Sequence, residues 1–574
     1  MIIKAQDNNI KHIINEEIAS VIKSKKILKK DALTETLNQA SIDGVRYDQY
    51  LINNGYLTEE VAASLIANYL GYEYTNIDVI KYSDEIVSQL SLEFIENNSF
   101  IALVYDTVED QYTIALADPF DSESVRKAYA LFGINARIII SPLSKIKKIA
   151  SRVHSKLTQG EAVTAYDKEI SSSDLSSSIS DDSMEGADLY DSPAVKLVES
   201  TLKGAIAVDA SDIHIEPYED IVRIRYRIDG KLLESISFNI KMFPAVSTRI
   251  KILAGLDIAE KRLPQDGRIS MAVNNIDYDF RVSTLPTING EKIVIRILDQ
   301  SAFEFKIENL GFVDSELSLI RNFIRRPHGI ILLTGPTGCG KSTTLYSFIK
   351  EINDESVNII TVEDPVEYSI EGVNQVQINA KANLTFASAL RSILRQDPNV
   401  VMIGEIRDEE TAEIAMRMAI TGHLVLSTLH TNDACGAVNR LVDLGLEPFF
   451  VADALTGVIS QRLVRRLCPE CKKPHITTKE EMNILHLKKE RQIYSPVGCP
   501  ACHNTGYKGR LGVHEVLNIT EDIKELVLKR APSSAIKEVA IKNGMLMLFD
   551  TCKKAVINGD TSIDELLAIV LGNE

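Results

Sequence analysis

The chain has 574 residues, of which 45% are hydrophobic and 25% charged, a globular composition with room for about four domains. Its formal net charge of −17 argues against broad binding to nucleic acid, which needs a basic face. The polar N-terminus predicts no signal peptide, and no apolar run approaches the ~18 residues of a membrane span. We therefore expect a cytoplasmic protein whose seven cysteines bind metal or remain free thiols.

The first 154 residues predict an N-terminal module, with a helical part followed by an α+β part. Residues 30–72 have the pattern of three short helices separated by Gly44 and Gly55. Further on, apolar runs predict strands and one helix, at Phe100–Tyr105, Tyr112–Ala117, Ser122–Phe132 (the helix) and Ala136–Ser141. Nothing in this module indicates catalysis, and its leucine spacing favours helix packing over a ligand site.

Residues 155–191 predict a flexible linker, because the serine and acidic residues from Ser171 to Asp182 offer little to bury. Ser192 and Pro193 then provide an N-cap and a first helical residue, which opens a middle α+β domain at 192–305. Within it, residues 222–228 alternate apolar residues with arginines, so three arginines share one face of a strand.

Two further strands of the middle domain carry one arginine each. Strand arginines are usually solvated or paired with acids, but five of them upstream of a phosphate loop favour contact with phosphate for some. The candidates are Arg223, Arg225, Arg227, Arg281 and Arg296.

A phosphate-binding loop follows the apolar run Ile330–Leu333, which predicts a buried strand. Gly335–Ser342 matches G-x-x-x-x-G-K-S, and Thr343 and Thr344 can open a helix, so the motif has the flanks it needs. Backbone N–H groups and the helix N-terminus would hold phosphate oxygens, Lys341 would reach the outer phosphates and Ser342 would bind Mg²⁺. The expected ATP-binding residues are Gly335, Pro336, Thr337, Gly338, Cys339, Gly340, Lys341, Ser342 and Thr343. We place the ATPase domain at 306–462.

Carboxylates follow two apolar runs beyond the loop. Glu363 and Asp364 end a strand at 359–362, and Glu405 follows a strand at 400–403. Parallel strands point their carboxyl ends into the ligand crevice, so we expect Glu405 to polarise the attacking water and the other pair to hold the metal through water. Simple capping of the following helices is the alternative.

Two histidines bracket the next predicted strand. His430 stands at its carboxyl end before a polar loop, which favours a role in sensing the terminal phosphate. His423 stands at the other end and is the weaker candidate, since an isolated histidine is more often a core residue.

Four cysteines form two C-x-x-C pairs, Cys468 with Cys471 and Cys499 with Cys502. Two such pairs complete a tetrahedral zinc site with no open position, so we expect structural zinc in a subdomain at 463–515. Redox chemistry is the disfavoured alternative, because one pair would suffice for it. Residues 516–574 predict amphipathic helices without a chemical motif.

Together these motifs resemble the secretion ATPases that power type IV pilus assembly and type II secretion. The resemblance rests on the phosphate loop, the acidic segments at 361–367 and 404–408, the histidine segment at 421–434 and the four cysteines, with 264–268 and 281–284 also matching. It implies a RecA-like core after a PAS-like middle domain, assembled as a homo-hexamer. Arg281 and Arg296 would reach a neighbour's nucleotide, while Arg391 and Arg395 match arginines of the RecA-like domain.

The long N-terminal region and the cysteines resemble extension motors rather than retraction motors, which lack both. The resemblance implies a peripheral position at the inner face of the cytoplasmic membrane, where the N-terminal module docks on a platform protein, and a hinge near residues 300–308. Some relatives bind cyclic di-GMP there through an Arg-Leu-Gly run. This chain has Leu37-Asn38-Gln39 instead, so cyclic di-GMP is a disfavoured ligand. A type II secretion motor, a nucleic-acid motor and a nucleotide-binding regulator without motor activity are the alternatives.

Overall fold

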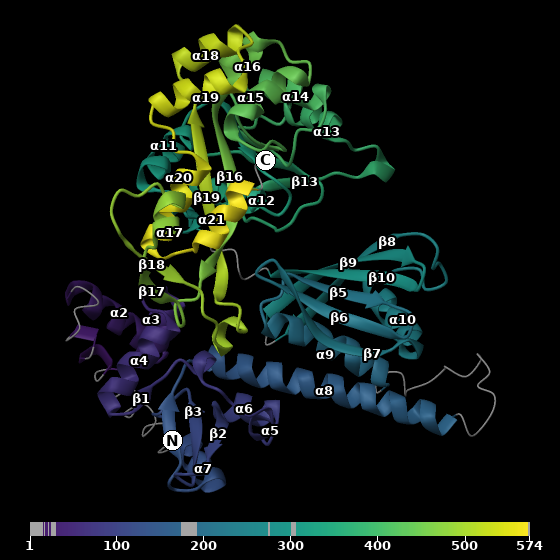
Figure 1. Cartoon of the computed structure of the whole chain (residues 1–574), viewed down its shortest axis with the longest axis vertical. Helices are drawn as coiled ribbons and strands as arrows, with labels where there is room; N and C mark the ends of the chain where they lie inside the picture. Colours follow the sequence, from purple (N-terminus) through teal and green to yellow (C-terminus); the bar gives the residue numbers. More distant parts are fainter. Residues whose placement is uncertain are drawn as a thin grey trace. The chain divides into compact units, whose positions relative to one another are not determined.

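The computed structural model describes residues 30–173, 192–273, 276–299 and 306–571, together with residues 15, 18–20, 22 and 23. Two compact units divide the chain at Ile297 and Leu298, and each is described here by itself (Figure 1). Among the described helices, none has the length and apolar character needed to cross a membrane.

The helices and strands predicted for the N-terminal module form in the predicted order, and β1, α5 and α6 are additional elements that the sequence did not predict. Three short helices, α2 (Lys30–Ile42), α3 (Tyr47–Asn53) and α4 (Glu59–Leu70), precede a four-stranded sheet of order β1-β4-β3-β2. Thr58 caps α4 with its side chain, and Gly71 ends it in the left-handed conformation. The remaining elements are β1 (Glu73–Tyr74), α5 (Asp84–Val87), α6 (Leu92–Asn98), β2 (Phe100–Asp106), β3 (Gln111–Leu116), α7 (Ser122–Phe132) and β4 (Arg137–Ile140).

Helix α8 (Leu143–Ser173) corrects the predicted linker, because residues 155–173 continue a helix that we expected to be flexible. Its first half packs Ile146, Ile149 and Val153 into the core of the N-terminal module. Its second half packs Ala162 into the core of the middle domain, and the buried Gln159 side chain donates to the Tyr226 hydroxyl at 3.1 Å. The apolar stripe therefore runs past residue 155, and the rest of the expected linker lies outside the described residues.

The middle domain is a six-stranded sheet of order β7-β6-β5-β10-β9-β8 with helices α9 (Pro193–Ala207) and α10 (Phe243–Ala254). Ser192 caps α9 and Pro193 is its first residue, as predicted. Isoleucines of β5, β6 and β10 pack with these helices, while charged residues occupy the alternate positions of the same strands. The strands are β5 (Asp212–Pro217), β6 (Ile221–Ile228), β7 (Lys231–Asn239), β8 (Gln265–Val273), β9 (Ile276–Thr287) and β10 (Gly290–Asp299).

The second unit is built on a seven-stranded sheet of order β13-β12-β14-β15-β11-β16-β19. Its strands are parallel except for the last pair, β16 and β19, which is antiparallel. The strands are β11 (Gly329–Thr334), β12 (Ile359–Glu363), β13 (Asn374–Gln377), β14 (Val400–Ile403), β15 (Leu424–Leu429), β16 (Leu455–Leu467) and β19 (Tyr507–Asn518). This is the RecA-like α/β architecture that the family resemblance implies.

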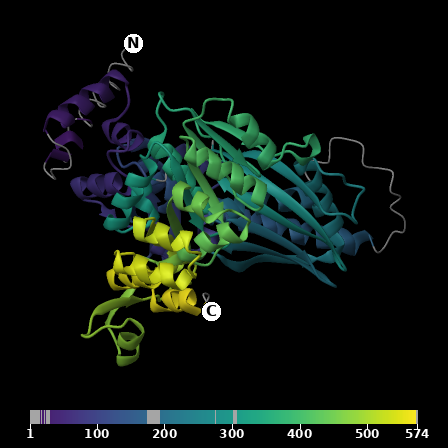
Figure 2. The same cartoon turned by 90° about the horizontal axis from the view of Figure 1, so that it is seen from above.

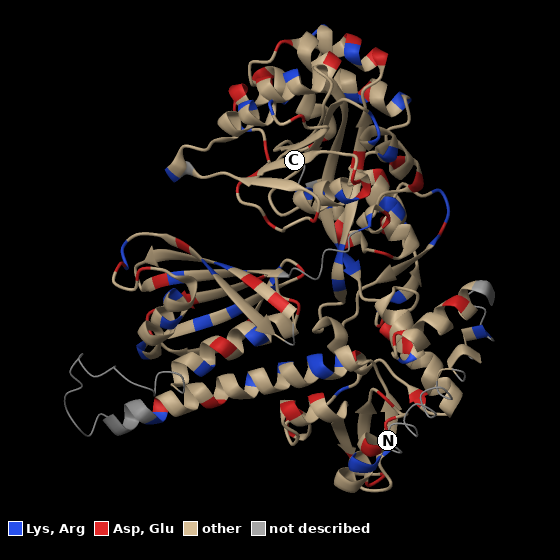
Figure 3. Cartoon of the chain, turned by 180° about the vertical axis from the view of Figure 1, so that it is seen from behind, with Lys and Arg blue, Asp and Glu red and all other residues tan. Residues whose placement is uncertain are grey.

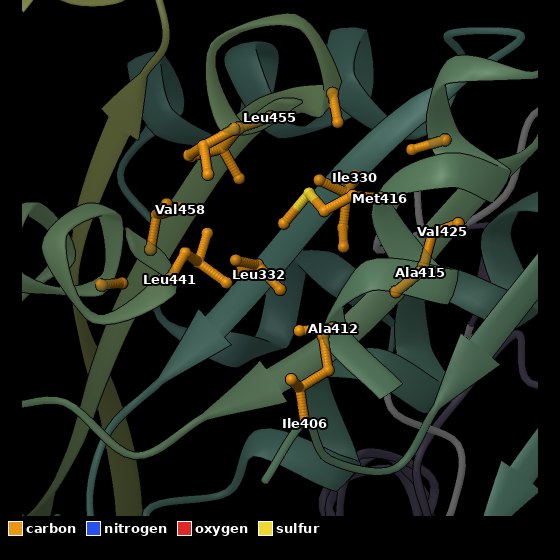
Figure 4. Close-up of a cluster of buried hydrophobic side chains, with 14 of the residues drawn as sticks. Ile330, Leu332, Ile406, Ala412, Ala415, Met416, Val425, Leu441, Leu455 and Val458 are labelled. Atoms are coloured by element: carbon orange, nitrogen blue, oxygen red, sulfur yellow. The ribbon is translucent and has the colours of Figure 1, made fainter. Parts of the chain in front are cut away.

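Alternation along β11 assigns its side chains to two cores, one on each face of the sheet. Ile330 and Leu332 join a core with α13 (Phe386–Ile393), α14 (Glu409–Ile420), α15 (Ala434–Asp443) and α16 (Pro448–Ala454) (Figure 4). Ile331 and Leu333 join the opposite core with α11 (Asp314–Ile324) and α12 (Lys341–Ile352). Helices cover both faces, which is why the parallel strands have continuous apolar sequences.

Strands β16 and β19 form a long antiparallel ribbon with a cysteine-bearing excursion at its end, so the subdomain boundaries at 463 and 515 cut through strands of the main sheet. Cys468 follows β16 directly, and β19 begins five residues after Cys502. The excursion holds β17 (Lys473–Ile476), α17 (Lys479–Ile484) and β18 (Gln492–Ser495), and it projects beside the C-terminal helices (Figure 2). These helices are α18 (Glu521–Leu528), α19 (Ser533–Lys542), α20 (Leu548–Asn558) and α21 (Ile563–Leu571).

Candidate active site

The phosphate loop connects β11 to α12, as its sequence predicts. Gly335, Gly338 and Gly340 have φ angles of 148°, 79° and 89°, which a residue with a side chain would rarely adopt. A Cβ atom at Gly335 would also lie 2.5 Å from the Gln461 carbonyl oxygen. The loop therefore requires glycine both for its backbone angles and for its close approach to β16.

Lys341 is folded back over this loop. Its Nζ donates to the carbonyl oxygens of Gly335 at 2.8 Å and Pro336 at 3.1 Å. Burial lowers the pKa of Lys341, and the charge of Arg462 adds to that effect, while Glu405 opposes it. An anion between the loop and the ammonium group would relieve this desolvation, which is what a phosphate-binding lysine requires. Ser342 is exposed at the start of α12.

The predicted acids and His430 follow neighbouring strands of the sheet. β12, β14 and β15 pair in parallel register, so Asp364, Glu405 and His430, each just beyond one of them, stand at the same edge. β11 pairs with β15, which places the phosphate loop at this edge too. We refer to this set of strand ends as the nucleotide edge.

Glu405 lies at the nucleotide edge between two basic neighbours, Arg407 and His430. Its side chain is only 15% exposed, forms an ion pair with Arg407 and lies 3.4 Å from Nε2 of His430. The pKa of Arg407 is raised, chiefly by its hydrogen bond to Glu405 and to a smaller extent by the charge of Asp364. Arg407 lies within the acidic segment 404–408, to which the sequence analysis assigned no role beyond Glu405.

Glu363 differs from Glu405, because its carboxylate is already occupied. It is 5% exposed and accepts hydrogen bonds from Thr361 at 2.5 Å, from Gln375 at 3.1 Å and from Tyr346. Burial and the nearby carboxylate raise the pKa of Tyr346, so the phenol remains a donor. Asp364, by contrast, is exposed. Of the two residues expected to hold the metal, Asp364 is the available one.

His423 lies at the amino end of β15, the opposite end from His430. Its Nδ1 is 3.0 Å from the Met418 carbonyl oxygen, and its own carbonyl accepts from the Gly329 amide at 3.2 Å. Six strand residues separate the two histidines, which is roughly 20 Å along the strand. This unit therefore brings His430 but not His423 to the nucleotide edge.

Arg391 lies in the last turn of α13 and Arg395 lies two residues beyond its end, and both are exposed. Arg391 forms an ion pair with Glu410, and Arg395 donates to the Arg391 carbonyl at 2.9 Å. Their roles toward nucleotide remain predictions.

The arginines of β6 have acidic partners on neighbouring strands. Arg223 pairs with Glu234 at 3.3 Å, Arg225 with Glu216 at 2.7 Å and Arg227 with Asp212 at 3.3 Å. Lysine and arginine thus alternate with acids over this sheet (Figure 3). For these three residues the ion-pair interpretation accounts for the sequence pattern without a phosphate.

Arg281 and Arg296 lie on β9 and β10, which are adjacent in the same sheet. Arg281 stands opposite Arg268 in register and is half-buried. Arg296 donates through Nε to Asp212 at 3.0 Å, yet its side chain is 61% exposed, so much of its guanidinium faces solvent. Action on a neighbour's nucleotide stays a prediction.

The four cysteines converge as predicted. All four Sγ atoms lie within 4.8 Å of one another, and the closest pairs are 3.7 to 3.9 Å apart. Four sulfurs at ~2.3 Å from a tetrahedral ion would be about 3.8 Å apart, so the cluster has the size of a zinc site. Burial opposes ionisation of Cys502, but amide hydrogen bonds from Cys499 and Gly506 bring its pKa down to about 7.

Sequence reasoning missed Gln461, a buried residue of β16 whose side chain touches the phosphate loop. No local motif marks it, because its role depends on the pairing of β11 with β16, in which Thr334 stands opposite Ser460, 126 positions further along the chain. The other three cysteines, Cys339, Cys435 and Cys552, are buried free thiols.

The chain is similar to known proteins over most of its length. Residues 188–568 match the family model described as type II/IV secretion system protein, and residues 70–159 match the MshEN domain. The chain is 37% identical to the type IV pilus assembly ATPase PilB of Myxococcus xanthus over 558 residues, covering 96% of this chain and 98% of that one. It is 48% identical to a putative type II secretion system protein E of Escherichia coli, over 66% of this chain and 77% of the relative. The Legionella pneumophila ATPase DotB shares the fold, with a TM-score of 0.50 and 21% identity over 65% of this chain and 95% of that one.

Proposed function

The chain belongs to the type II/IV secretion system protein family of motor ATPases, and from that membership we propose that it powers extension of type IV pili. One observation carries the choice. The similarity to the Myxococcus xanthus pilus assembly ATPase spans 96% of this chain, N-terminal region included, while the Escherichia coli secretion relative covers 66%. A motor that uses the same N-terminal region would dock on the same kind of platform.

In the proposed reaction, ATP lies on the phosphate loop with its outer phosphates at Lys341. Backbone N–H groups of the loop and the N-terminus of α12 hold the phosphate oxygens. Mg²⁺, when bound with ATP, supplies positive charge against the phosphates. Ser342 and Asp364 are the residues that would hold it, directly and through water, because both are exposed at the nucleotide edge.

Glu405 is the proposed general base. Arg407 forms an ion pair with its Oε1, and Nε2 of His430 lies 3.4 Å from its Oε2, so both neighbours orient the carboxylate. From there it accepts a proton from the water that attacks the terminal phosphate, and His430 lies where it would sense that phosphate. Glu363, held by Tyr346 and Thr361, anchors the strand end instead.

The cysteine cluster is proposed to hold one structural zinc ion. The four sulfurs have tetrahedral spacing, and all four positions are filled by protein, so no site is left open for catalysis. The ion would connect the segment after β16 to the segment before β19 and so stabilise the end of the β16–β19 ribbon.

Assembly as a homo-hexamer would bring Arg281 and Arg296 to a neighbour's nucleotide, in keeping with the open side of Arg296. The N-terminal module is proposed to dock on the inner-membrane platform protein at the cytoplasmic face. Cyclic di-GMP is a secondary candidate ligand there, since residues 70–159 match the MshEN domain although the Arg-Leu-Gly run is absent.

Deletion of the gene tests the choice between pilus assembly and secretion. We expect surface pili to disappear, while secreted enzymes reach the medium at normal levels. Normal piliation with lost secretion would instead establish a type II secretion motor, which the 48% identity to the Escherichia coli relative favours as the second candidate. Restoration by the intact gene and not by Lys341→Ala is the control.

A further inference from the structure

β16 continues past the point where its neighbour ends. β11 and β16 are parallel, and Thr334 at the end of β11 stands opposite Ser460. Gln461 is therefore level with Gly335, the first residue of the phosphate loop, and β16 extends on to Leu467 beneath that loop. Residues of β16 beyond Ser460 can therefore contact the phosphate loop directly.

The Gln461 side chain makes two hydrogen bonds, one to each end of the loop–helix junction. Its Nε2 donates to the Cys339 carbonyl at 2.8 Å, and its Oε1 accepts from the Thr344 hydroxyl at 2.8 Å. Gln461 is 3% exposed and Thr344 is fully buried, so water does not replace either bond. A carboxamide is the side chain that can donate and accept at once at this reach.

Contact between Gln461 and the loop backbone is close. A Cβ atom at Gly340 would lie 2.8 Å from Nε2 of Gln461. The next residue, Arg462, donates to the Gln461 carbonyl at 3.1 Å and to the Asn432 carbonyl at 2.8 Å, which ties β16 to the loop after His430. Two adjacent residues of β16 thus contact the two loops of the nucleotide edge, Gln461 the phosphate loop and Arg462 the loop after His430.

We propose that Gln461 is a positioning residue of the nucleotide site, which holds the phosphate loop in its binding shape through Cys339 and Thr344. The inference rests on the proposed nucleotide site. Loop amides must point inward before phosphate arrives, and a residue that fixes their direction lowers the cost of binding. Gln461 touches no phosphate itself, so it acts on affinity more than on the chemical step.

The test is Gln461→Leu in the full-length protein, with Mg·ADP binding measured by calorimetry. We expect the Kd to rise roughly tenfold, as when a buried carbonyl and a hydroxyl lose their partners. KM for ATP should rise by a similar factor, while kcat changes less than threefold. Thr344→Val should give part of the effect, and the double variant should bind no more weakly than Gln461→Leu.

Thr551→Val is the matched control, because it removes another buried hydrogen bond, to the His514 carbonyl at 2.8 Å, in the same unit. It should lower thermal stability comparably and leave the Kd unchanged. An unchanged Kd in Gln461→Leu, or an equal rise in Thr551→Val, would overturn the inference.

Gln461→Glu serves if Gln461→Leu does not fold. It keeps the acceptor for Thr344 but loses the donor to Cys339, so we expect an intermediate rise in Kd, and wild-type affinity would refute the positioning role. Binding of Mg·ADP by the unmodified chain, abolished in Lys341→Ala, must accompany any result. Its absence would overturn the nucleotide site itself.

Discussion

Charged residues serve differently at the nucleotide edge and within the middle sheet. At the edge, Asp364, Glu405 and His430 stand just beyond the ends of parallel strands. In the middle sheet, Arg225 and Arg227 lie inside a strand, and each has an acid on the neighbouring strand. Strand ends leave charges available to a ligand, whereas strand interiors use them for cross-strand pairs. Arg296 is an intermediate case, paired through one nitrogen and 61% exposed.

Replacing Arg296 gives the largest expected effect and tests that intermediate case. An arginine acting on a neighbour's nucleotide contributes ~10³–10⁵ in rate, so Arg296→Ala should nearly abolish ATP hydrolysis. Asp212 keeps Arg227 at 3.3 Å, and the sheet should remain folded by circular dichroism. Arg225→Ala, the matched paired arginine, should keep activity within tenfold and lower the Tm by a few degrees. Equal losses in both variants would erase the distinction.

Mixing variants before assembly tests action between subunits. Arg281→Ala and Lys341→Ala should each be nearly inactive alone, and their mixture should recover part of the activity at interfaces with both residues intact. Confirmed mixed hexamers without single-turnover activity would contradict the arrangement in trans.

The two glutamates at neighbouring strand ends sharpen the comparison further. Glu405→Gln should lower kcat by ~10²–10⁴ and leave ATP binding intact, because the amide cannot accept the proton. Glu363→Gln should lower kcat less than tenfold and reduce thermal stability, since its hydrogen bonds from Tyr346 and Thr361 are buried. Steady-state hydrolysis and nucleotide-binding assays measure both. Near-normal turnover in Glu405→Gln would reject it as base.

The four cysteines also lie outside strands, between the end of β16 and the start of β19, and their side chains face one another. We expect one zinc ion per chain by elemental analysis, lost in Cys502→Ser. Structural zinc contributes ~10–16 kcal/mol of apparent binding free energy, so residues 468–506 should then become sensitive to protease while the phosphate loop stays protected. Full protease resistance of the metal-free protein would exclude the zinc assignment. Cys552→Ser, elsewhere in the same unit, is the control.

The smallest effect concerns His514, a titratable group in a strand interior. It is fully buried against Phe312, with ring centroids 3.7 Å apart, and burial lowers its pKa to about 3. Neither ring nitrogen has a hydrogen-bond partner among the residues the structure describes.

The unfolded chain takes up this proton near pH 6.5 and the folded chain only near pH 3, so the contribution of His514 to stability is complete above pH 6.5 and falls with pH below it. The slope is up to ~1.4 kcal/mol per pH unit. Denaturant unfolding from pH 7 to 5 should show His514→Phe losing less stability than the wild type, and parallel curves would contradict this.

Local patterns predicted the parts of the fold whose causes are local. Ser122–Phe132 forms a helix with the predicted ends, the glycine loop follows a buried strand, and the cysteine pairs meet. Prediction failed where a distant partner decides the outcome. Around Gln159 and Ala162 the sequence has too few apolar residues to predict a helix. The helix forms there because α9 and β6 pack against these two residues. The predicted limits of the cysteine subdomain, residues 463 and 515, fall inside β16 and β19, because these two strands pair with each other as far as Leu467 and Tyr507.

The site shows the same limit. Sequence alone treats Glu363 and Asp364 as a pair, and only the packing of Tyr346 and Gln375 separates them. Gln461 carries no motif, because strand pairing places it under the loop.

Helix α8 has a mechanical consequence. Its 31 residues span about 46 Å, and within that length Val153 lies in the core of the N-terminal module while Ala162, about 14 Å further along the helix, lies in the core of the middle domain. A continuous helix resists bending, so it can serve as a lever arm between those two cores. A 10° tilt of the middle domain about Ala162 would then displace Ile146, about 24 Å away along the helix, by about 4 Å. Glycine substitutions near Leu157, which is exposed between the two cores, would make α8 easier to bend without changing the nucleotide site.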